Sequence, residues 1–217
     1  MNDPAPTAAL QARGIEGITF MAATRMEARA IVRRIPDAHV VTCGMGLSRQ
    51  CDELRDCVVS CGVAGGLRHD LPTGTVVIPD EVGRADGGRT RCDPPLVEAF
   101  AHAARALGIE PVIAPLLTSD NLVTGDERQR WAALGFVAVD METARIAAPR
   151  VAAVRVILDT PQRELSPDWH QPLRALLKPW NWPQAFWLAR EAPKASELAA
   201  RVVAQGIGHD VRITRQW

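Results

Sequence analysis

Two carboxylates stand shortly after apolar runs in the second half of the chain. The run 137–139 leads to Met141 and Glu142, and the run 154–158 leads to Asp159. Such runs are typical of buried strands, so both acids would lie at strand carboxyl ends, where open α/β sheets bind ligands. There Glu142 could take both hydroxyls of a ribose while the thioether of Met141 packs against the sugar. The competing interpretation is a strand end followed by a first helical turn, whose dipole favours acids.

Glu27 and Asp159 have the residue type and the position expected of a base and an acid. Glu27 falls in the first turn of a predicted helix, just past the first strand. It could act as a general base that polarises water, or simply be an acid at a helix N-terminus. Asp159 could cap a helix, or burial in a cleft could raise its pKa until it protonates a leaving group. The residues alone leave both interpretations open.

Two glycine clusters follow predicted strands, Gly44-Met45-Gly46 and the run 62–66. Glycine lets the backbone approach a ligand closely and present N–H groups to anions or sugar oxygens. A glycine cluster is also typical of an ordinary tight turn. Neither cluster matches the dinucleotide-binding fingerprint or the phosphate-binding loop with its lysine.

Alternating strands and helices are expected to position these residues. This order predicts an α/β fold, a three-layer αβα sandwich around a largely parallel sheet. The predicted strands cover residues 17–22, 38–42, 57–61, 75–79, 112–117, 137–139 and 153–158, and the predicted helices cover 26–35, 48–55, 95–107 and 125–134.

The character of the chain changes after Asp159. Residues 161–217 are rich in proline and tryptophan and are predicted to form a helical tail or lid, with helices at 182–191 and 194–205. The tryptophans could pack as core and lid, or face a lipid, because tryptophan favours membrane interfaces. Residues 1–14 are expected to be a disordered leader before a single domain at 15–217. The clustered tryptophans are Trp169, Trp180, Trp182 and Trp187.

Composition narrows the classes of function. The 217 residues suit one domain, and 25 basic against 25 acidic residues leave no positive excess that would indicate a nucleic-acid partner. The five cysteines lack C-x-x-C spacing, so we expect no metal site and place the protein in the reducing cytoplasm. We see no signal peptide and no apolar stretch approaching the ~20 residues that span a bilayer.

Taken together, these segments resemble the nucleoside phosphorylase/nucleosidase superfamily, which includes purine nucleoside phosphorylases and methylthioadenosine/S-adenosylhomocysteine nucleosidase. The resemblance covers roughly residues 17–160, in family order. The tail after Asp159 resembles, more loosely, that of the hopanoid-associated phosphorylases, which are implicated in removing adenine from adenosylhopane. The matching pieces are Met26-Glu27, Gly44-Met45-Gly46, Gly62 to Leu67, Val139 to Thr143 and Arg155 to Asp159.

The resemblance implies a role for each residue. Glu27 falls on the acid that activates water, and Asp159 on the acid that protonates the purine at N7. Met141 and Glu142 fall on the ribose-binding pair, and Arg155 would support the acids or the glycine loop. The other residues expected to bind substrate are Gly44, Gly46, Ala64, Gly65, Gly66, Val139 and, on the base, Leu122 and Val123.

The sequence also departs from the family pattern. Leu122 stands where the family usually has an aromatic residue. The segments between Gly46 and Cys61 and between Glu142 and Arg155 are shorter than the family's helices, and Pro149 would break a helix there. These departures predict a trimmed fold.

The predicted function is an enzyme that cleaves the N-glycosidic bond of a purine nucleoside. We expect hydrolytic release of adenine, without a cofactor, from an adenosyl lipid such as adenosylhopane. Water is preferred because Glu27 is present and because the first glycine loop lacks a Gly-Asp-Pro phosphate pattern. Phosphate as co-substrate is the alternative, since Arg25, Arg29 and Arg49 could bind an anion. The other alternative is a non-catalytic nucleoside-binding protein. We also expect the protein to be cytoplasmic, to form a homo-oligomer and to contact the membrane peripherally through its tail.

Overall fold

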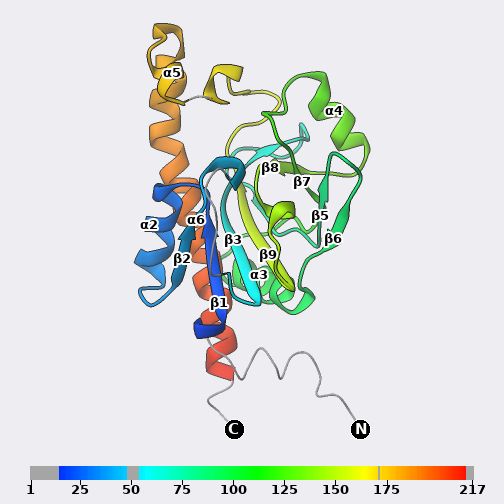
Figure 1. The fold of residues 1–217 in the computed structure, drawn as a ribbon, viewed down its shortest axis with the longest axis vertical. Helices are drawn as coiled ribbons and strands as arrows, with labels where there is room; N and C mark the ends of the chain where they lie inside the picture. The colour runs from blue at the N-terminus through cyan, green and yellow to red at the C-terminus, as the bar shows by residue number, and fades with distance from the viewer. Residues whose placement is uncertain (1–14, 48–53, 171, 214–217) are drawn as a thin grey trace.

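The computed structural model describes residues 15–47, 54–170 and 172–213. The predicted leader and most of the predicted helix at 48–55 lie outside this range. Within it, nine strands and five α-helices alternate along the chain (Figure 1). The strands are β1 (Ile18–Ala22), β2 (His39–Thr42), β3 (Cys57–Gly66), β4 (Val76–Val77), β5 (Glu81–Arg84), β6 (Arg89–Arg91), β7 (Leu116–Thr118), β8 (Ala138–Asp140) and β9 (Arg150–Ile157). The helices are α2 (Arg25–Arg34), α3 (Pro94–Ala106), α4 (Asp126–Ala133), α5 (Pro172–Leu176) and α6 (Trp182–Ile213).

The strands form one mixed sheet with β3 at its centre. The main order is β2-β1-β3-β8-β7-β5-β6, and β9 pairs with β3 and β4. β3 is parallel to β1 on one side and to β9 on the other, and its last two residues pair antiparallel with β8. This mixed α/β fold, with its helical C-terminal tail, confirms the predicted fold class.

The second glycine cluster is a strand, not the turn that the sequence predicted. Gly62–Gly66 continue β3, so this strand is ten residues long rather than five. The absence of side chains lets neighbouring strands and the side chains of other elements approach closely on both sides. A tight turn is therefore replaced by extended backbone that runs through the middle of the candidate site.

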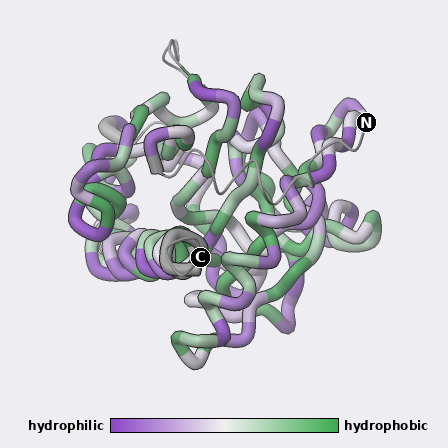
Figure 2. The backbone as a smooth tube through the Cα atoms, turned by 90° about the horizontal axis from the view of Figure 1, so that it is seen from below, coloured by the Kyte–Doolittle hydropathy of each residue, from purple (hydrophilic) through white to green (hydrophobic). Residues whose placement is uncertain are grey.

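Helix α6 is a single helix of 32 residues, where two helices separated at Pro193 were predicted. Proline removes one backbone hydrogen bond and crowds the preceding turn. The helix continues through Pro193 because buried alanines and valines after it pack on β3, β9, α2 and α3. Figure 2 views α6 nearly end-on beside the body that holds the sheet.

One face of the sheet is covered by helices α2, α6 and α3, and α6 lies between the other two. A second group of apolar residues lies around Met21, Cys43 and Val58, where the loop residues Leu47 and Ile146 pack. The segment 146–149 is irregular, in agreement with the expected effect of Pro149. The connection between Glu142 and β9 therefore places a short 3-10 turn at Thr143–Arg145 and an irregular segment, rather than a long helix, on this group of residues.

The tail divides into packed and exposed aromatic residues. Trp187 packs against the main core beneath the Arg163 guanidinium, 4.3 Å from its ring centre. Five of the nine exposed large apolar side chains of the described chain lie at α5 and the start of α6, which extend beyond α2 (Figure 1). No described helix is both long and apolar enough to cross a bilayer. The five are Leu176, Leu177, Trp180, Trp182 and Phe186, called the apolar tip below.

Candidate functional site

Glu27 is a buried carboxylate fixed at the start of α2. Thr24 caps this helix, and the two residues form a capping box. Glu27 Oε2 accepts hydrogen bonds from the Thr24 backbone N–H and hydroxyl, both at 2.8 Å, and Oε1 accepts one from the Val63 N–H at 3.0 Å. Glu27 therefore completes the helix start, as one interpretation of the sequence expected, and also reaches the central strand.

Gly62 brings Glu27 and Arg155 to the same point. A Cβ atom at Gly62 would overlap Glu27 Oε1 and would lie 2.7 Å from Glu27 Cδ and 2.9 Å from Arg155 Nη1. Only glycine leaves room for both side chains over β3. Within the second glycine cluster, Gly62 thus allows other side chains to approach the strand and does not form a turn.

Arg155 is a fully buried cation that gathers the polar groups of four segments. Its Nη2 lies 2.7 Å from Asp140 Oδ2 and 3.6 Å from Glu142 Oε2, and donates to the hydroxyls of Ser60 at 2.6 Å and Thr143 at 2.9 Å. Burial alone would lower its pKa, but the surrounding carboxylates raise it above its ordinary value. Arg155 therefore stays charged and orders the acids around it.

Glu142 lies at the end of β8 with its carboxylate pointing toward the first glycine cluster. Its Oε1 accepts a hydrogen bond from the Gly46 N–H at 2.9 Å, and Gly46 has a left-handed φ of 65°. Burial, together with Asp140 and Glu27, raises the pKa of Glu142 to about 7, against the opposing effects of Arg155 and the Gly46 N–H. Met141, beside it, is half-buried. Its side chain also approaches the first glycine cluster: a Cβ added to Gly46 would lie 3.9 Å from Met141 Cε.

Asp159 lies just past β9 and is paired with a cation that the sequence analysis did not identify. The buried Arg128 of α4 binds Asp159 Oδ2 through Nη2 and the Gly66 carbonyl through Nη1. Burial raises the pKa of Asp159, although Arg128 opposes this shift. Both carboxylate oxygens lie near Gly65, where a Cβ would be 3.2 Å from Asp159 Oδ1 and 3.4 Å from Oδ2.

The remaining residues that were predicted to bind substrate lie in paired strands, in a buried apolar cluster or in the loop after β2. Ala64 and Gly65 pair with β9 and β8 in the sheet, and Val139 is the partner of Gly65. The Val123 side chain is buried in a small apolar cluster with Val139, whereas Leu122 is half-buried. Gly44 has a left-handed φ of 74° in the loop after β2.

The structure thus gathers the predicted residues into two groups along β3. The first group surrounds Gly62 and contains Glu27, Glu142 and Arg155; the second surrounds Gly65 and contains Asp159. Three residues of strand separate them, roughly 10 Å at about 3.3 Å per residue.

Sequence reasoning missed the polar residues that hold these groups. Asp140 accepts hydrogen bonds from Thr118 at 2.7 Å and from the N–H groups of Glu142 and Thr143, besides binding Arg155. Its place between a buried run and Glu142 was the available signal. Arg128 gave none, because a single arginine in a polar helix indicates a solvated face.

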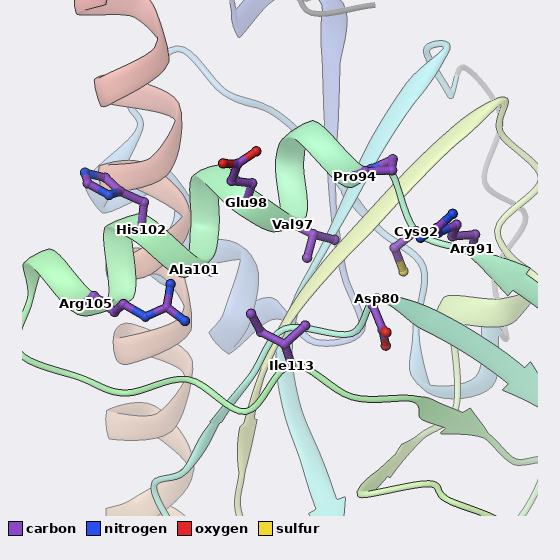
Figure 3. Close-up of a pocket in the computed structure, with 10 residues that line it drawn as sticks. All are labelled: Asp80, Arg91, Cys92, Pro94, Val97, Glu98, Ala101, His102, Arg105 and Ile113. Atoms are coloured by element: carbon purple, nitrogen blue, oxygen red, sulfur yellow. The ribbon is translucent and has the colours of Figure 1, made fainter.

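Two surface pockets lie outside these groups. One of about 370 Å³ lies between α3 and the segments that carry Asp80, Cys92 and Ile113 (Figure 3). The other, about 470 Å³, lies along α2 and is lined by Arg25 and Arg29, on the side of that helix opposite Glu27. Neither is lined by a residue expected to be catalytic or to bind the nucleoside, but the second is lined by Arg25 and Arg29, two of the three arginines considered above for binding an anion. Arg49, the third of these arginines, lies outside the described residues. Among the described residues, no cluster of acids, cysteines and histidines could hold a metal ion.

Chemically, the two groups offer complementary carboxylates. Glu27 keeps both oxygens fixed by donors and can accept a proton from a polarised water molecule. Asp159 is a buried acid with a raised pKa, which suits proton donation. Glu142, in the first group, offers two acceptor oxygens to hydroxyl groups.

Comparison with known proteins shows the family and the fold of the chain. A model of the phosphorylase superfamily matches residues 21–169. The 5′-methylthioadenosine/S-adenosylhomocysteine nucleosidase of Helicobacter pylori superposes with a TM-score of 0.67 at 14% identity, over 90% of this chain and 99% of that one. The nucleosidase of Neisseria meningitidis, in complex with methylthio-immucillin-A, gives 0.66 at 18% identity, over 88% and 98%. Futalosine hydrolase of H. pylori gives 0.65 at 15% identity, over 88% and 97%. No curated protein sequence matches the chain.

Proposed function

This chain belongs to the phosphorylase superfamily, and on that premise we propose that it is a nucleosidase that hydrolyses the N-glycosidic bond of a purine nucleoside. The observation that carries the proposal is the placement of Glu27 and Asp159 at Gly62 and Gly65 of one strand. The fold shared with the nucleosidases of H. pylori and N. meningitidis supports the same reaction.

Glu27 takes the proton of the attacking water. Three hydrogen bonds from Thr24 and Val63 fix its carboxylate before substrate binds, so little reorganisation accompanies the reaction. The ionised carboxylate has about four acceptor positions, and the three donors leave one for water. Attack occurs at the anomeric carbon as the bond to the base breaks, through a transition state that resembles an oxocarbenium ion.

Glu142 and Met141 hold the ribose. The carboxylate accepts one sugar hydroxyl on each oxygen, and Arg155 keeps its orientation from behind. The half-buried thioether of Met141 packs against the apolar side of the sugar. At the other end, Asp159 donates a proton to N7 of the base, which leaves as the neutral purine.

The preferred substrate is an adenine nucleoside with an apolar substituent on the sugar, such as adenosylhopane. The apolar tip supports this choice, because exposed apolar patches on a soluble fold mark interaction surfaces. Of the basic residues in 172–190, Lys178 is paired with Asp168 and Arg190 with Glu191, so the apolar side chains rather than the charges of this segment support membrane contact. We therefore propose a cytoplasmic enzyme that meets its lipid-linked substrate at the membrane.

Release of free base tests the proposal. The protein is incubated with adenosylhopane, methylthioadenosine and inosine, and the products are separated by chromatography. We expect adenine from the adenine nucleosides, and a loss of about 10²–10⁴-fold in turnover for Glu27→Gln with nucleoside binding retained. The control Glu98→Gln, at an exposed acid of α3, should be unchanged.

Each other outcome has a defined meaning. Binding without base release from any nucleoside would make the chain a nucleoside-binding protein and overturn the proposal. Normal turnover by Glu27→Gln would remove Glu27 from the reaction and leave phosphate as the acceptor to examine.

A further inference from the structure

Arg128 is a buried cation in contact with the acid that protonates the base in the proposed reaction. Its side chain is 2% exposed, and it joins three elements: Nη1 binds the Gly66 carbonyl of β3, and Nη2 binds Asp159 after β9. An arginine whose only counter-ion gained a proton would be left buried and uncompensated, at a cost of several kcal/mol. Arg128 and a proton-donating Asp159 therefore conflict unless a second carboxylate is present.

Glu164 is that second carboxylate. Its Oε1 lies 3.2 Å from Arg128 Nε and accepts a hydrogen bond from the Gly125 N–H at 2.8 Å. Its backbone carbonyl accepts a hydrogen bond from Gln184 Nε2 at 2.8 Å. Glu164 is thus tied to the start of α4 and to α6, and it contacts Nε of Arg128, whereas Asp159 contacts Nη2. The side chain of Glu164 is 32% exposed, whereas that of Asp159 is 8% exposed.

We propose that Arg128 and Glu164 are positioning residues for proton transfer by Asp159. Arg128 holds Asp159 Oδ2 and leaves Oδ1 toward the base, and Glu164 keeps the guanidinium paired while Asp159 carries its proton. This inference rests on the proposed nucleosidase function and extends it to two residues.

The proton transfer is balanced within this arrangement. The O–H bond of Asp159 breaks, an N7–H bond forms, and the electron pair of the glycosidic bond stays with the departing base. Asp159 becomes a carboxylate beside Arg128, so the guanidinium stabilises the charge that develops. Glu27 takes the proton of the attacking water, and exchange with solvent restores both acids.

The two positioning residues act on Asp159 with opposite sign, which makes the test specific. The charged groups facing Asp159 within the described chain are Arg128 from α4 and Glu164 from the loop after β9. Because Asp159 must be protonated to act, kcat falls as pH rises through its pKa. Arg128→Met should move this decline to higher pH by about 1–3 units, and Glu164→Gln should move it to lower pH by about half a unit or more.

Two controls accompany the pH profiles. Arg128→Lys keeps the positive charge, so the decline of kcat should lie closer to its wild-type pH than in Arg128→Met. Asp126→Asn changes an exposed acid of the same helix and should leave the pH of the decline unchanged. The carboxyl ¹³C resonance of Asp159, identified by its loss in Asp159→Asn, is titrated by NMR in each variant. This titration needs no turnover, so it tests the charge arrangement even if no nucleoside is cleaved.

Shifts in opposite directions in the NMR titration, matched by the kcat profiles, are the expected result. Unchanged titration of Asp159 in Glu164→Gln, or shifts of both variants in one direction, would overturn the inference. Should Arg128→Met fail to fold, Glu164→Gln and Arg128→Lys still decide the question.

Discussion

Glu142 is the residue whose charge changes near neutral pH. Burial raises its pKa to about 7, and only the ionised form offers two acceptors to the ribose hydroxyls. Nucleoside affinity should therefore increase as pH rises through about 7 and weaken below it. Calorimetric titration with a non-hydrolysed nucleoside analogue across this range measures the effect. Glu142→Gln should bind weakly at every pH, and an unchanged pH dependence in that variant would assign the effect to another group.

Gly62 is the residue at which the smallest change should displace Glu27. A methyl group there would overlap Glu27 Oε1 and crowd Arg155 Nη1 at 2.9 Å. We expect Gly62→Ala to lower the free energy of unfolding by about 1–3 kcal/mol and to reduce turnover more than nucleoside binding. Denaturant unfolding and steady-state kinetics measure the two effects.

Gly208 supplies the matched control. Nothing lies within 4 Å of a Cβ on this helical glycine, so Gly208→Ala should stabilise the protein by up to about 1 kcal/mol. Equal behaviour of the two variants would mean that Glu27 moves aside without consequence.

At the scale of elements, the start of α6 connects the apolar tip with the candidate site. Gln184 Oε1 accepts hydrogen bonds from the Ser166 N–H at 3.0 Å and from Trp169 Nε1 at 2.7 Å, and its Nε2 binds the Glu164 carbonyl. The loop that carries Glu164 is therefore fixed by the same helix that presents Trp182 and Phe186. A change at the tip that moved this helix would also reach Arg128.

The apolar tip should bind membranes without supporting the core. Trp180 and Phe186 are 71% and 74% exposed, so the double change Trp180→Ala, Phe186→Ala should leave the melting temperature nearly unchanged. Sedimentation with phosphatidylcholine vesicles containing phosphatidylserine should decrease, and activity on a lipid-linked nucleoside should fall more than activity on adenosine. Trp187→Ala, by contrast, removes a ring packed on the core and should lower the melting temperature.

Two other results would refute the membrane role. Vesicle binding that persists in the double variant would place the contact elsewhere. A loss of self-association, measured by analytical ultracentrifugation without lipid, would make the tip an interface between copies of the chain.

The sequence predicted most of the elements because their periodicity is local. Helix α2, for example, was expected at 26–35 and occurs at Arg25–Arg34. Predictions failed where distant packing outweighs local preference, as at the glycines of β3 and at Pro193 of α6. The β5–β6 hairpin was missed altogether, although Asp86-Gly87 at its turn was a usable signal.

The acids of the candidate site were predictable because they follow buried runs, but their partners were not. Glu27, Glu142 and Asp159 each stand near the end of a strand, and the structure gathers them along β3. Arg128 contacts Asp159 across 31 residues of sequence, and no local pattern distinguishes it from a surface arginine. The roles of all four residues stay predictions until the variants are measured.

At the scale of the whole molecule, the central strand β3 brings Glu27 to Gly62 and Asp159 to Gly65. Helices α2, α6 and α3 pack on the sheet, and the site is built from strand ends and the loops that follow them. The chain belongs to the phosphorylase superfamily. The deciding question is therefore whether water or phosphate attacks the sugar. Glu27, fixed by Thr24 and Val63, favours water.

The identity of the sugar product tests this claim most directly. The wild-type protein is incubated with methylthioadenosine in phosphate-free buffer and again with added phosphate, and both adenine and the sugar are quantified. Adenine and free methylthioribose should form in equal amounts, at the same rate with and without phosphate. Release of adenine only when phosphate is present, with a sugar 1-phosphate as the second product, would contradict the hydrolytic account.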